Sequence, residues 1–278
     1  MATQTTTDTE RKTRVGKFVW FEHASNDPKK AQKFYAEVIG WKVLPWGDST
    51  YEMIQAGDTK ESMIGGYTDL KSGEKARWVS YVSVDDVDAA ARAAAANGGR
   101  VLEEPFDLPD VGRTARIADP QGAELYLFKS ASGDTADSPG TEAPPPRRIF
   151  WNELHTSDPV KALSFYEKLL GYTHQTMDMG PDGSYYVLSS RDGVGRGGIM
   201  GQMTKEWGPH WLPYVSVDDP DATLERVAKH GGKVHYGPED IPGIGRFGVL
   251  VDPTGAVLAI MKAIPPKGKQ ACPWFSSR

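Results

Sequence analysis

One stretch occurs twice in the chain, as WFEHASNDPKKAQKFYAEVIGW at residues 20–41 and as WNELHTSDPVKALSFYEKLLGY at residues 151–172. The copies share Trp-x-Glu, Asp-Pro, Phe-Tyr and a Gly that precedes an aromatic residue. The alternating apolar run before Asp-Pro predicts a strand. Asp-Pro is typical of a helix start, because Asp caps free N–H groups and Pro fits the first turn. The Gly predicts the end of that helix. Each copy therefore predicts strand, helix and strand.

The repeat continues beyond this stretch, at an offset of 133 positions (252 − 119) instead of 131 (151 − 20). A repeat at a fixed period indicates duplicated structural units. We therefore predict two homologous domains, with two residues inserted in the second. The recurring motifs are YVSVDD (81–86 and 214–219), Gly-Gly-[Arg/Lys]-Val (98–101 and 231–234) and Asp-Pro-x-Gly-Ala (119–123 and 252–256).

Each domain is predicted to consist of two βαβββ halves. Apolar alternation and Gly-containing turns predict three short strands after the first helix, and the same order then restarts. Antiparallel strands with one short helix per half define the α+β class. In the first domain the predicted strands are 15–25, 41–45, 51–55, 63–67, 78–84, 100–104, 114–118 and 124–129, and the helices begin after Asp27 and at Val87.

Composition shifts predict the domain boundaries. Ser, Gly, Asp and Pro are concentrated between the two repeats, and this segment ends in three prolines, which is typical of a linker that stiffens toward its end. The predicted organisation is a disordered N-terminal tail (1–14), domain 1 (15–130), a Pro-rich linker (131–146), domain 2 (147–264) and a C-terminal tail (265–278).

Charge and cysteine content narrow the classes of partner and compartment. The net charge is −5, which gives no reason to expect nucleic acid or an anionic membrane as partner. Cys272 is the only cysteine, so neither an intrachain disulfide nor a cysteine-rich metal site is expected. The sequence has no apolar run of membrane-spanning length and no signal peptide. We therefore expect a cytoplasmic protein.

The ordered set of motifs resembles the vicinal oxygen chelate superfamily, which includes glyoxalases, bleomycin-resistance proteins and extradiol dioxygenases. The motifs are Phe-Tyr-x4-Gly-[Trp/Tyr], Val-Asp-Asp-x-Asp-Ala and Asp-Pro-x-Gly-Ala, each present in both domains. The Trp-x-Glu opening and the tandem layout are most similar to two-domain glyoxalase-like proteins of actinobacteria, some of which are labelled hydroxylases in antibiotic clusters. The resemblance implies that two βαβββ units form a cupped mixed sheet, whose concave face binds the ligand.

The resemblance also locates the positions at which metal-dependent members carry His or Glu. A divalent ion needs carboxylate or imidazole ligands, and these six positions offer none. We therefore expect no cofactor, and neither the usual glyoxalase nor the usual dioxygenase mechanism. The six residues are Trp20, Val79 and Tyr126 in domain 1 and Trp151, Leu212 and Ala259 in domain 2.

One alternative metal site remains in domain 2. Residues two apart share a strand face, so Glu153 and His155 lie together, and His210 could join them from a neighbouring strand. These three residues could hold one divalent metal. The other interpretation is a hydrogen-bonded Glu with two unrelated His residues. Domain 1 has Glu22, Ala24 and Arg77 at the matching positions, which cannot form this trio.

The carboxyls Glu22 and Glu153 are candidate catalytic residues, because burial beside a Trp raises a carboxyl pKa and can produce a general acid or base. Alternatively, each is bound to backbone amides or to an Arg. Aromatic residues on the strands are candidate ligand-binding residues, with core packing as the alternative. They are Trp20, Tyr51, Tyr81, Tyr126, Trp151, Tyr185 and Tyr214.

Two functions follow from these residues. The first is a glyoxalase- and bleomycin-resistance-like protein that binds a small organic, aromatic molecule in a metal-free cup. The second is an enzyme of the same superfamily, a lyase, oxygenase or hydroxylase of secondary metabolism, which uses a pocket Glu or a metal in domain 2. The domains are expected to pair within the chain or in a homodimer.

Overall fold

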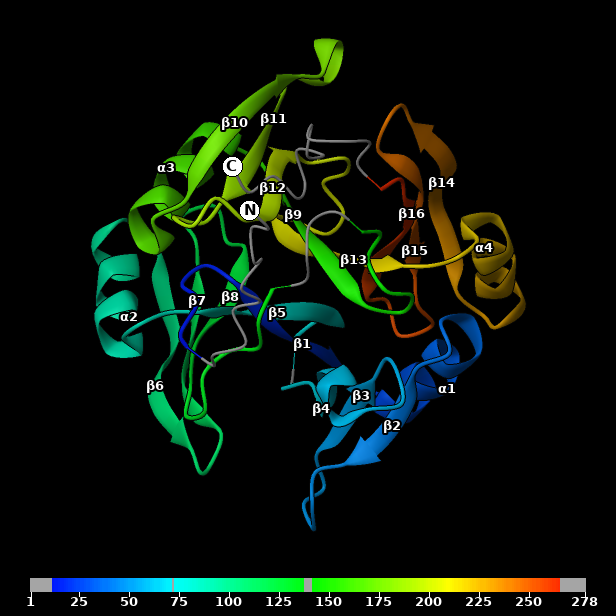
Figure 1. Cartoon of the computed structure of the whole chain (residues 1–278), viewed down its shortest axis with the longest axis horizontal. Helices are drawn as coiled ribbons and strands as arrows, with labels where there is room; N and C mark the ends of the chain where they lie inside the picture. Colours follow the sequence, from blue (N-terminus) through cyan, green and yellow to red (C-terminus); the bar gives the residue numbers. More distant parts are fainter. Residues whose placement is uncertain (1–11, 72, 138–141, 266–278) are drawn as a thin grey trace, which may run out of the picture.

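A computed structural model describes residues 12–71, 73–137 and 142–265, and contains two eight-stranded mixed sheets in this part of the chain. The strand order is β2-β3-β4-β1-β5-β8-β7-β6 in the first sheet and β10-β11-β12-β9-β13-β16-β15-β14 in the second (Figure 1). Each sheet is therefore two βαβββ halves joined at their first strands. The α+β class and the two domains predicted from the repeat are confirmed, and so are the cupped sheets that the family resemblance implied.

The two domains contain the same elements in the same order. Domain 1 comprises β1 (Phe18–Ser25), α1 (Pro28–Val38), β2 (Lys42–Pro45), β3 (Glu52–Gln55), β4 (Met63–Asp69), β5 (Arg77–Ser83), α2 (Val87–Ala96), β6 (Arg100–Leu108), β7 (Gly112–Ala118) and β8 (Glu124–Ser130). Domain 2 comprises β9 (Ile149–Thr156), α3 (Pro159–Leu170), β10 (Thr173–Asp178), β11 (Ser184–Ser189), β12 (Gly195–Gly201), β13 (His210–Ser216), α4 (Pro220–Lys229), β14 (Lys233–Ile241), β15 (Gly245–Val251) and β16 (Val257–Ala263).

The helix starts follow the Asp-Pro signal of the sequence. The Asp27 side chain accepts a hydrogen bond from the backbone N–H of Lys30, and Asp158 does the same for Lys161. A carboxylate at this position satisfies one N–H that has no partner within the helix. Helix α3 ends at Gly171, whose left-handed conformation (φ +67°) is one that glycine adopts without strain. No helix in the described ranges is both long and apolar enough to cross a membrane.

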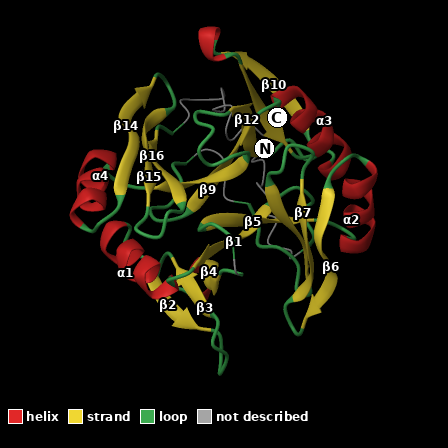
Figure 2. Cartoon of the chain, turned by 180° about the vertical axis from the view of Figure 1, so that it is seen from behind, coloured by secondary structure: helices red, strands yellow, loops and turns green. Residues whose placement is uncertain are grey.

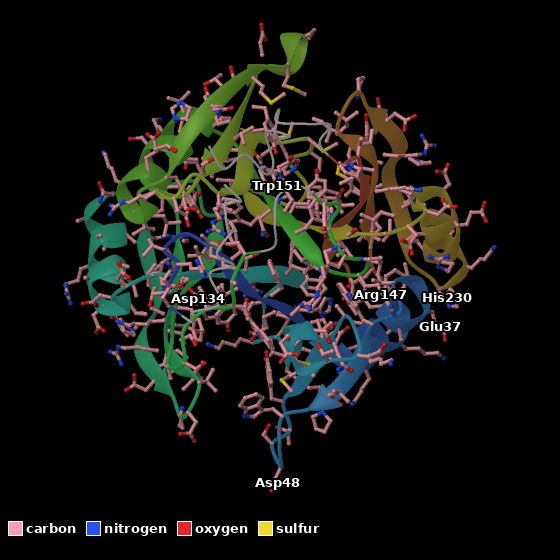
Figure 3. The ribbon with its side chains drawn as sticks, in the orientation of Figure 1. Glu37, Asp48, Asp134, Arg147, Trp151 and His230 are labelled. Atoms are coloured by element: carbon pink, nitrogen blue, oxygen red, sulfur yellow. The ribbon has the colours of Figure 1, made fainter. Side chains whose placement is uncertain are left out.

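The helices cover one face of each sheet, and we call the opposite face the cup face (Figure 2). In domain 1, Phe21 packs with the helical residues Phe34 and Tyr35 in one buried cluster. Alternate residues of a strand point to opposite faces, so Trp20 and Glu22 lie on the cup face. The hairpins β2–β3 and β6–β7 project to the same side of the molecule, with Asp48 at the tip of the first (Figures 1 and 3).

The two domains share their hydrophobic cores. Helix α1 contacts α4 and helix α2 contacts α3, so each contact joins one domain to the other (Figure 1). Phe34 and Tyr35 of α1 pack in the same buried cluster as Leu250 and Leu258 of domain 2. A second cluster reciprocally places Phe165 of α3 with residues of domain 1. The apolar faces of these helices therefore bury surface between the domains as well as within them.

Reciprocal hydrogen bonds accompany this packing. The Tyr35 hydroxyl donates to Asp252 Oδ2 over 3.0 Å and accepts from Trp78 Nε1 over 3.0 Å. In the other direction, the Tyr166 hydroxyl donates to Asp119 Oδ2 over 3.1 Å. It also accepts from Trp211 Nε1 over 3.0 Å. The Asp of each Asp-Pro-x-Gly-Ala loop is therefore held by a tyrosine from the helix of the other domain.

The two contacts between the domains differ by one histidine, which is present beside Asp252 but not beside Asp119. His23 Nε2 lies 2.7 Å from Asp252 Oδ2, and both side chains are fully buried. The equivalent residue in domain 2 is Leu154 (23 + 131), so Asp119 has no such partner. Burial alone would raise the pKa of Asp252, but the hydrogen bond and charge of His23 outweigh it and lower that pKa. Burial raises the pKa of Asp119 despite three backbone N–H donors.

Residues at the N-terminal side of domain 1 contact the linker. Lys12 pairs with Asp134 in an isolated β-bridge, and the backbone N–H of buried Arg14 donates to the Asp134 carboxylate over 2.6 Å. Asp137 lies 3.1 Å from Lys17 Nζ and 2.6 Å from the Arg196 guanidinium of domain 2. This part of the linker therefore connects the domains through ion pairs. The remainder of the predicted N-terminal tail (1–11), linker residues 138–141 and residues 266–278 of the C-terminal tail lie outside the described residues.

Candidate functional site

Strand register places the candidate residues of domain 1 on one face. Glu22 on β1 is opposite Gly66 on β4 and Val79 on β5. Trp20 is opposite Tyr81, which is opposite Tyr126 on β8. Directly opposed residues of neighbouring strands point to the same side of a sheet. Trp20, Glu22, Val79, Tyr81 and Tyr126 therefore all lie on the cup face.

Glu22 is held by tyrosine hydroxyls. Its Oε2 accepts from the Tyr81 hydroxyl over 3.1 Å and from the Tyr51 hydroxyl over 3.4 Å. Trp20 Nε1 donates to the Tyr51 hydroxyl over 3.0 Å. Burial raises the pKa of Glu22 despite these two hydrogen bonds. The alternative interpretation, a Glu bound to backbone amides or to an Arg, is wrong for Glu22, because its side-chain partners in the described residues are phenols.

Domain 2 repeats this arrangement and adds a histidine. Trp151 Nε1 donates to the Tyr185 hydroxyl over 3.0 Å, and the Tyr214 hydroxyl donates to Glu153 Oε1 over 2.9 Å. His155 Nε2 also lies 2.8 Å from Glu153 Oε1. Burial alone would raise the pKa of Glu153, but the hydrogen bond and charge of His155 outweigh it and lower that pKa. The pKa values of the two equivalent carboxyls are therefore shifted in opposite directions. The shift favours the neutral form of Glu22 and the charged form of Glu153.

The two cup faces also differ in accessibility. In domain 2 the candidate aromatic residues are part of a buried cluster, with Trp151 only 1% exposed. Phe247, Val249, Ala259 and Met261 belong to the same cluster. In domain 1, Trp20, Glu22, Tyr51 and Tyr126 remain partly exposed, and only Tyr81 is buried. Core packing therefore accounts for Trp151, Tyr185 and Tyr214, whereas most of their domain 1 counterparts reach the surface.

The cup faces of the two domains also differ in residue type at two equivalent positions. Register shows that Val249 occupies the place of Arg116 and Ala259 the place of Tyr126. Arg116 lies 3.1 Å from Glu103 and 3.1 Å from Glu124, and the Tyr81 and Tyr126 rings stack at 4.3 Å. At these two positions the cup face of domain 1 is therefore charged and aromatic, and that of domain 2 is apolar. Sequence reasoning missed Arg116 and Glu103, which only the pairing of β7 with β6 and β8 brings to this face.

The residues present do not fit the metal that the fold family implies. Register places Trp20, Val79 and Tyr126 on the cup face of domain 1, and none carries a carboxylate or imidazole. In domain 2, His155 and His210 stack at 5.4 Å, and His210 Nδ1 faces the Gly208 carbonyl at 2.9 Å. Burial lowers the pKa of His210 to about 4.

The alternative trio in domain 2 is therefore only partly assembled as predicted. His155 and Glu153 are hydrogen-bonded, and His210 is adjacent to His155. Within residues 12–71, 73–137 and 142–265, no group of three or more His, Cys, Asp and Glu side chains is arranged to hold a metal ion. The interpretation of two unrelated His residues is also wrong for His155, since it contacts Glu153 directly.

Gly66 makes room for the hydroxyl that contacts Glu22. A Cβ at this position would lie 2.1 Å from the Tyr51 hydroxyl oxygen, so Gly66→Ala is expected to displace Tyr51 and cost about 1–3 kcal/mol through overpacking. Urea denaturation measures the cost. The matched variant is Gly198→Ala, whose Cβ would lie 2.0 Å from the Tyr185 hydroxyl. Because Tyr185 is buried and less free to move, we expect Gly198→Ala to be the more destabilising. A larger loss for Gly66→Ala would contradict this account of the two faces.

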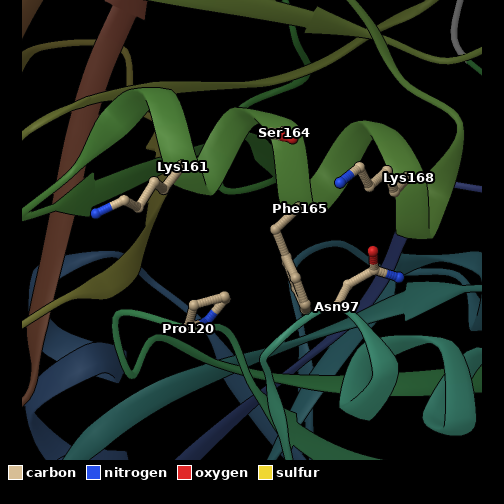
Figure 4. A pocket seen from close by; sticks show the side chains of 6 residues that line it. All are labelled: Asn97, Pro120, Lys161, Ser164, Phe165 and Lys168. Carbon is tan, nitrogen blue, oxygen red and sulfur yellow. The ribbon is translucent and has the colours of Figure 1, made fainter.

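Two cavities lie at the contacts between the domains, away from the cup faces. One of about 240 Å³ separates α3 from the end of α2 and is lined by Asn97, Pro120, Lys161, Ser164, Phe165 and Lys168 (Figure 4). The other, of about 390 Å³, lies beside the end of α1 and the start of α4, with Arg147 and Arg226 among its lining residues. Neither contains a carboxylate–phenol arrangement like that of Glu22.

The paired βαβββ units, the cupped sheets and the carboxyl on the central strand define a two-domain glyoxalase-like protein. A family model for the Glyoxalase/Bleomycin resistance protein/Dioxygenase superfamily matches residues 17–127 and again residues 148–260. The chain belongs to this superfamily, as the resemblance of its motifs predicted.

Sequence relatives match this chain along most of their length. "Putative glyoxylase CFP32" of Mycobacterium tuberculosis is 35% identical over 260 residues, which cover 91% of this chain and 97% of that protein. The anthracycline biosynthesis protein DnrV of Streptomyces peucetius is 30% identical over 264 residues, covering 87% and 92%. Among solved structures, the Mn(II)-bound glyoxalase of Novosphingobium aromaticivorans matches with a TM-score of 0.64 at 21% identity, covering 90% of this chain and 83% of that one. That structural match is one of fold.

Proposed function

We propose that this protein binds a small aromatic molecule on the cup face of domain 1. The observation that carries the proposal is the unequal accessibility of two equivalent sites. In domain 2, Trp151 and Tyr185 belong to a buried apolar cluster and Glu153 is buried beside it. Their equivalents in domain 1, Trp20, Tyr51 and Glu22, are partly exposed. Partly buried aromatic residues with a few polar groups are typical of small-molecule sites.

Exposed apolar residues extend this face outward. The backbone N–H of Trp46 donates to the Tyr51 carbonyl, which pairs Trp46 with Tyr51 on the cup face, and Trp46 is 50% exposed. On the opposite side, Phe106 is paired with Thr114 and is 41% exposed. Trp46 and Phe106 would lie on either side of a flat ligand bound above the stacked Tyr81 and Tyr126.

Protein groups alone would provide this binding. The residue types at the family's metal positions support a metal-free site, since Trp20, Val79 and Tyr126 supply aromatic and apolar surface instead of ligands. The relationship to a protein named for anthracycline biosynthesis is consistent with an aromatic ligand, because anthracyclines contain fused aromatic rings. Small-molecule binding of this kind includes sequestration.

Calorimetric titration with a panel of fused-ring aromatic compounds tests the proposal. We expect one or more to bind, and Tyr126→Ala to weaken binding by about 10-fold, since an aromatic contact contributes roughly 0.5–1.5 kcal/mol beyond its buried area. Tyr236→Ala, an exposed tyrosine of domain 2, is the matched control and should bind as the unaltered protein does. Weakened binding in Tyr236→Ala alone would place the site in domain 2 and contradict the proposal.

A proton-transfer enzyme is the second candidate function, and the environment of Glu22 favours it. A carboxyl whose pKa is raised by burial, and which two phenols orient, is suited to act as a general acid or base. Glu22→Gln preserves the shape of the side chain and removes its acid–base chemistry. On an identified substrate, this change should lower kcat by about 100-fold or more while substrate binding persists. Unchanged turnover in Glu22→Gln would exclude this role.

A further inference from the structure

The duplication shows what can occupy the space beside the Glu22 carboxyl. In domain 2, position 155 is a histidine whose Nε2 lies 2.8 Å from the Glu153 carboxylate. The equivalent residue in domain 1 is Ala24 (155 − 131), on the same strand face as Glu22 and two residues further along β1. The carboxyl is present in both domains, whereas its imidazole partner is present in one. Domain 1 therefore lacks the group that pairs with this carboxyl in domain 2.

The other charged groups near Glu22 have partners of their own. Arg77, which is opposite Ala24, lies 3.2 Å from Glu74 and 3.3 Å from Glu124. Arg116 lies between Glu74, Glu103 and Glu124. Both the charge on Glu103 and burial oppose ionisation of Glu22, while Arg116 favours it from a distance. Among the residues that the structure describes, no cationic side chain contacts Glu22, and the groups that do are the Tyr51 and Tyr81 hydroxyls.

We infer that the ligand of the domain 1 cup face is an aromatic molecule that carries a protonated amine, and that this amine pairs with Glu22 in the place that His155 takes beside Glu153. This inference rests on the proposed aromatic site and specifies its polar contact. A cation that contacts a partly buried carboxylate forms a charge-assisted hydrogen bond, which is stronger than a neutral one. Trp20 and Tyr81 are opposite each other on this face and add aromatic surface near the carboxylate.

A matched set of probes tests the charge of the ligand. The probes are 2-naphthylmethylamine, 2-naphthylmethanol and 2-naphthoic acid, which share one ring system and differ in charge. Calorimetric titration at pH 7 should show the amine binding about 10- to 100-fold more tightly than the alcohol, the range that a hydrogen bond to a charged group provides, and the acid binding weakest. Equal or tighter binding of the alcohol would overturn the inference and leave the aromatic site standing. Absence of binding by all three would overturn both.

Two variants test whether Glu22 causes the preference for the amine over the alcohol. Glu22→Gln should abolish the preference for the amine while the alcohol still binds, and the exposed matched control Glu225→Gln should preserve it. Ala24→His supplies the partner that domain 2 contains, and should reduce amine binding more than alcohol binding. If Ala24→His does not fold, Glu22→Gln still decides the matter. An amine preference that persists in Glu22→Gln would show that another group recognises the cation, and would overturn the inference.

Discussion

Asp252→Ala is expected to lower the free energy of unfolding by about 3–5 kcal/mol, the range observed when one partner of a buried ion pair is removed. The change leaves His23 and the Tyr35 hydroxyl buried without their shared acceptor, and removes the acceptor of three backbone N–H groups in its own loop. Urea denaturation followed by tryptophan fluorescence measures the loss. Because His23 and Tyr35 belong to domain 1 and Asp252 to domain 2, the variant should also weaken the contact between the domains.

Asp119→Ala is the matched control for this prediction. Asp119 accepts the same three loop N–H groups and a tyrosine hydroxyl from the other domain, but it has no histidine. The difference between the two variants therefore reports His23 together with the Thr254 hydroxyl, which also donates to Asp252 over 2.6 Å, and we expect Asp252→Ala to be the more destabilising. The double variant His23→Leu with Asp252→Ala should recover part of the difference. Equal losses for the two single variants would show that neither His23 nor the Thr254 hydroxyl adds to the stability of the contact.

Replacing Glu by Gln in the two cups is expected to change stability in opposite directions at pH 7. Glu153→Gln removes the charge that pairs with buried His155, and should destabilise the protein by about 3–5 kcal/mol. Glu22→Gln removes a carboxyl whose charged form burial disfavours, so stability at pH 7 should be preserved or increased. The two variants are otherwise isosteric and lie at equivalent positions. Thermal unfolding of both proteins against the unaltered chain measures the contrast.

The pH dependence of these two effects follows from the direction of each pKa shift. The pKa of Glu153 is lowered on folding, so its stabilisation is present above the pKa of an unfolded Glu, about 4.3, and is lost as the pH falls through the folded value. The pKa of Glu22 is raised, so its contribution is complete below about pH 4.3 and is lost as the pH rises through the folded value. The advantage of Glu22→Gln should therefore shrink below pH 4.3. A loss of stability in Glu22→Gln at pH 7 would contradict the conclusion that this carboxyl has no cationic partner.

Much of the fold could be predicted because each local signal occurs twice, once in each domain. Asp-Pro, the helix-ending Gly and the alternating runs are local signals, and each occurs in both domains at nearly constant spacing. The lack of metal-ligating side chains at the family positions followed from residue identity alone, and register confirms that those of domain 1 lie on the cup face.

The contacts of the site could not be predicted in the same way, because they depend on strand register and on the packing of distant segments. Tyr51 reaches Glu22 only because β3 pairs with β4 and β4 pairs with β1. The difference between the cups depends on Arg116 and Tyr126 being replaced by Val249 and Ala259, and only the strand pairing brings these residues to one face. The hydrogen bond from Tyr35 to Asp252 joins residues that are far apart in the sequence, and no local pattern predicts it.

Covalent linkage of the two domains also removes a constraint that symmetry would impose. In a dimer of identical chains, a histidine at position 23 would appear at both contacts, and so would a histidine at position 155. In this chain each histidine occurs once, at one of two equivalent positions. One interface can therefore contain a buried histidine–aspartate hydrogen bond, and one cup can fill its own carboxyl site, while the counterpart has neither. Division of labour between the halves is thus available by single substitutions, without a second gene.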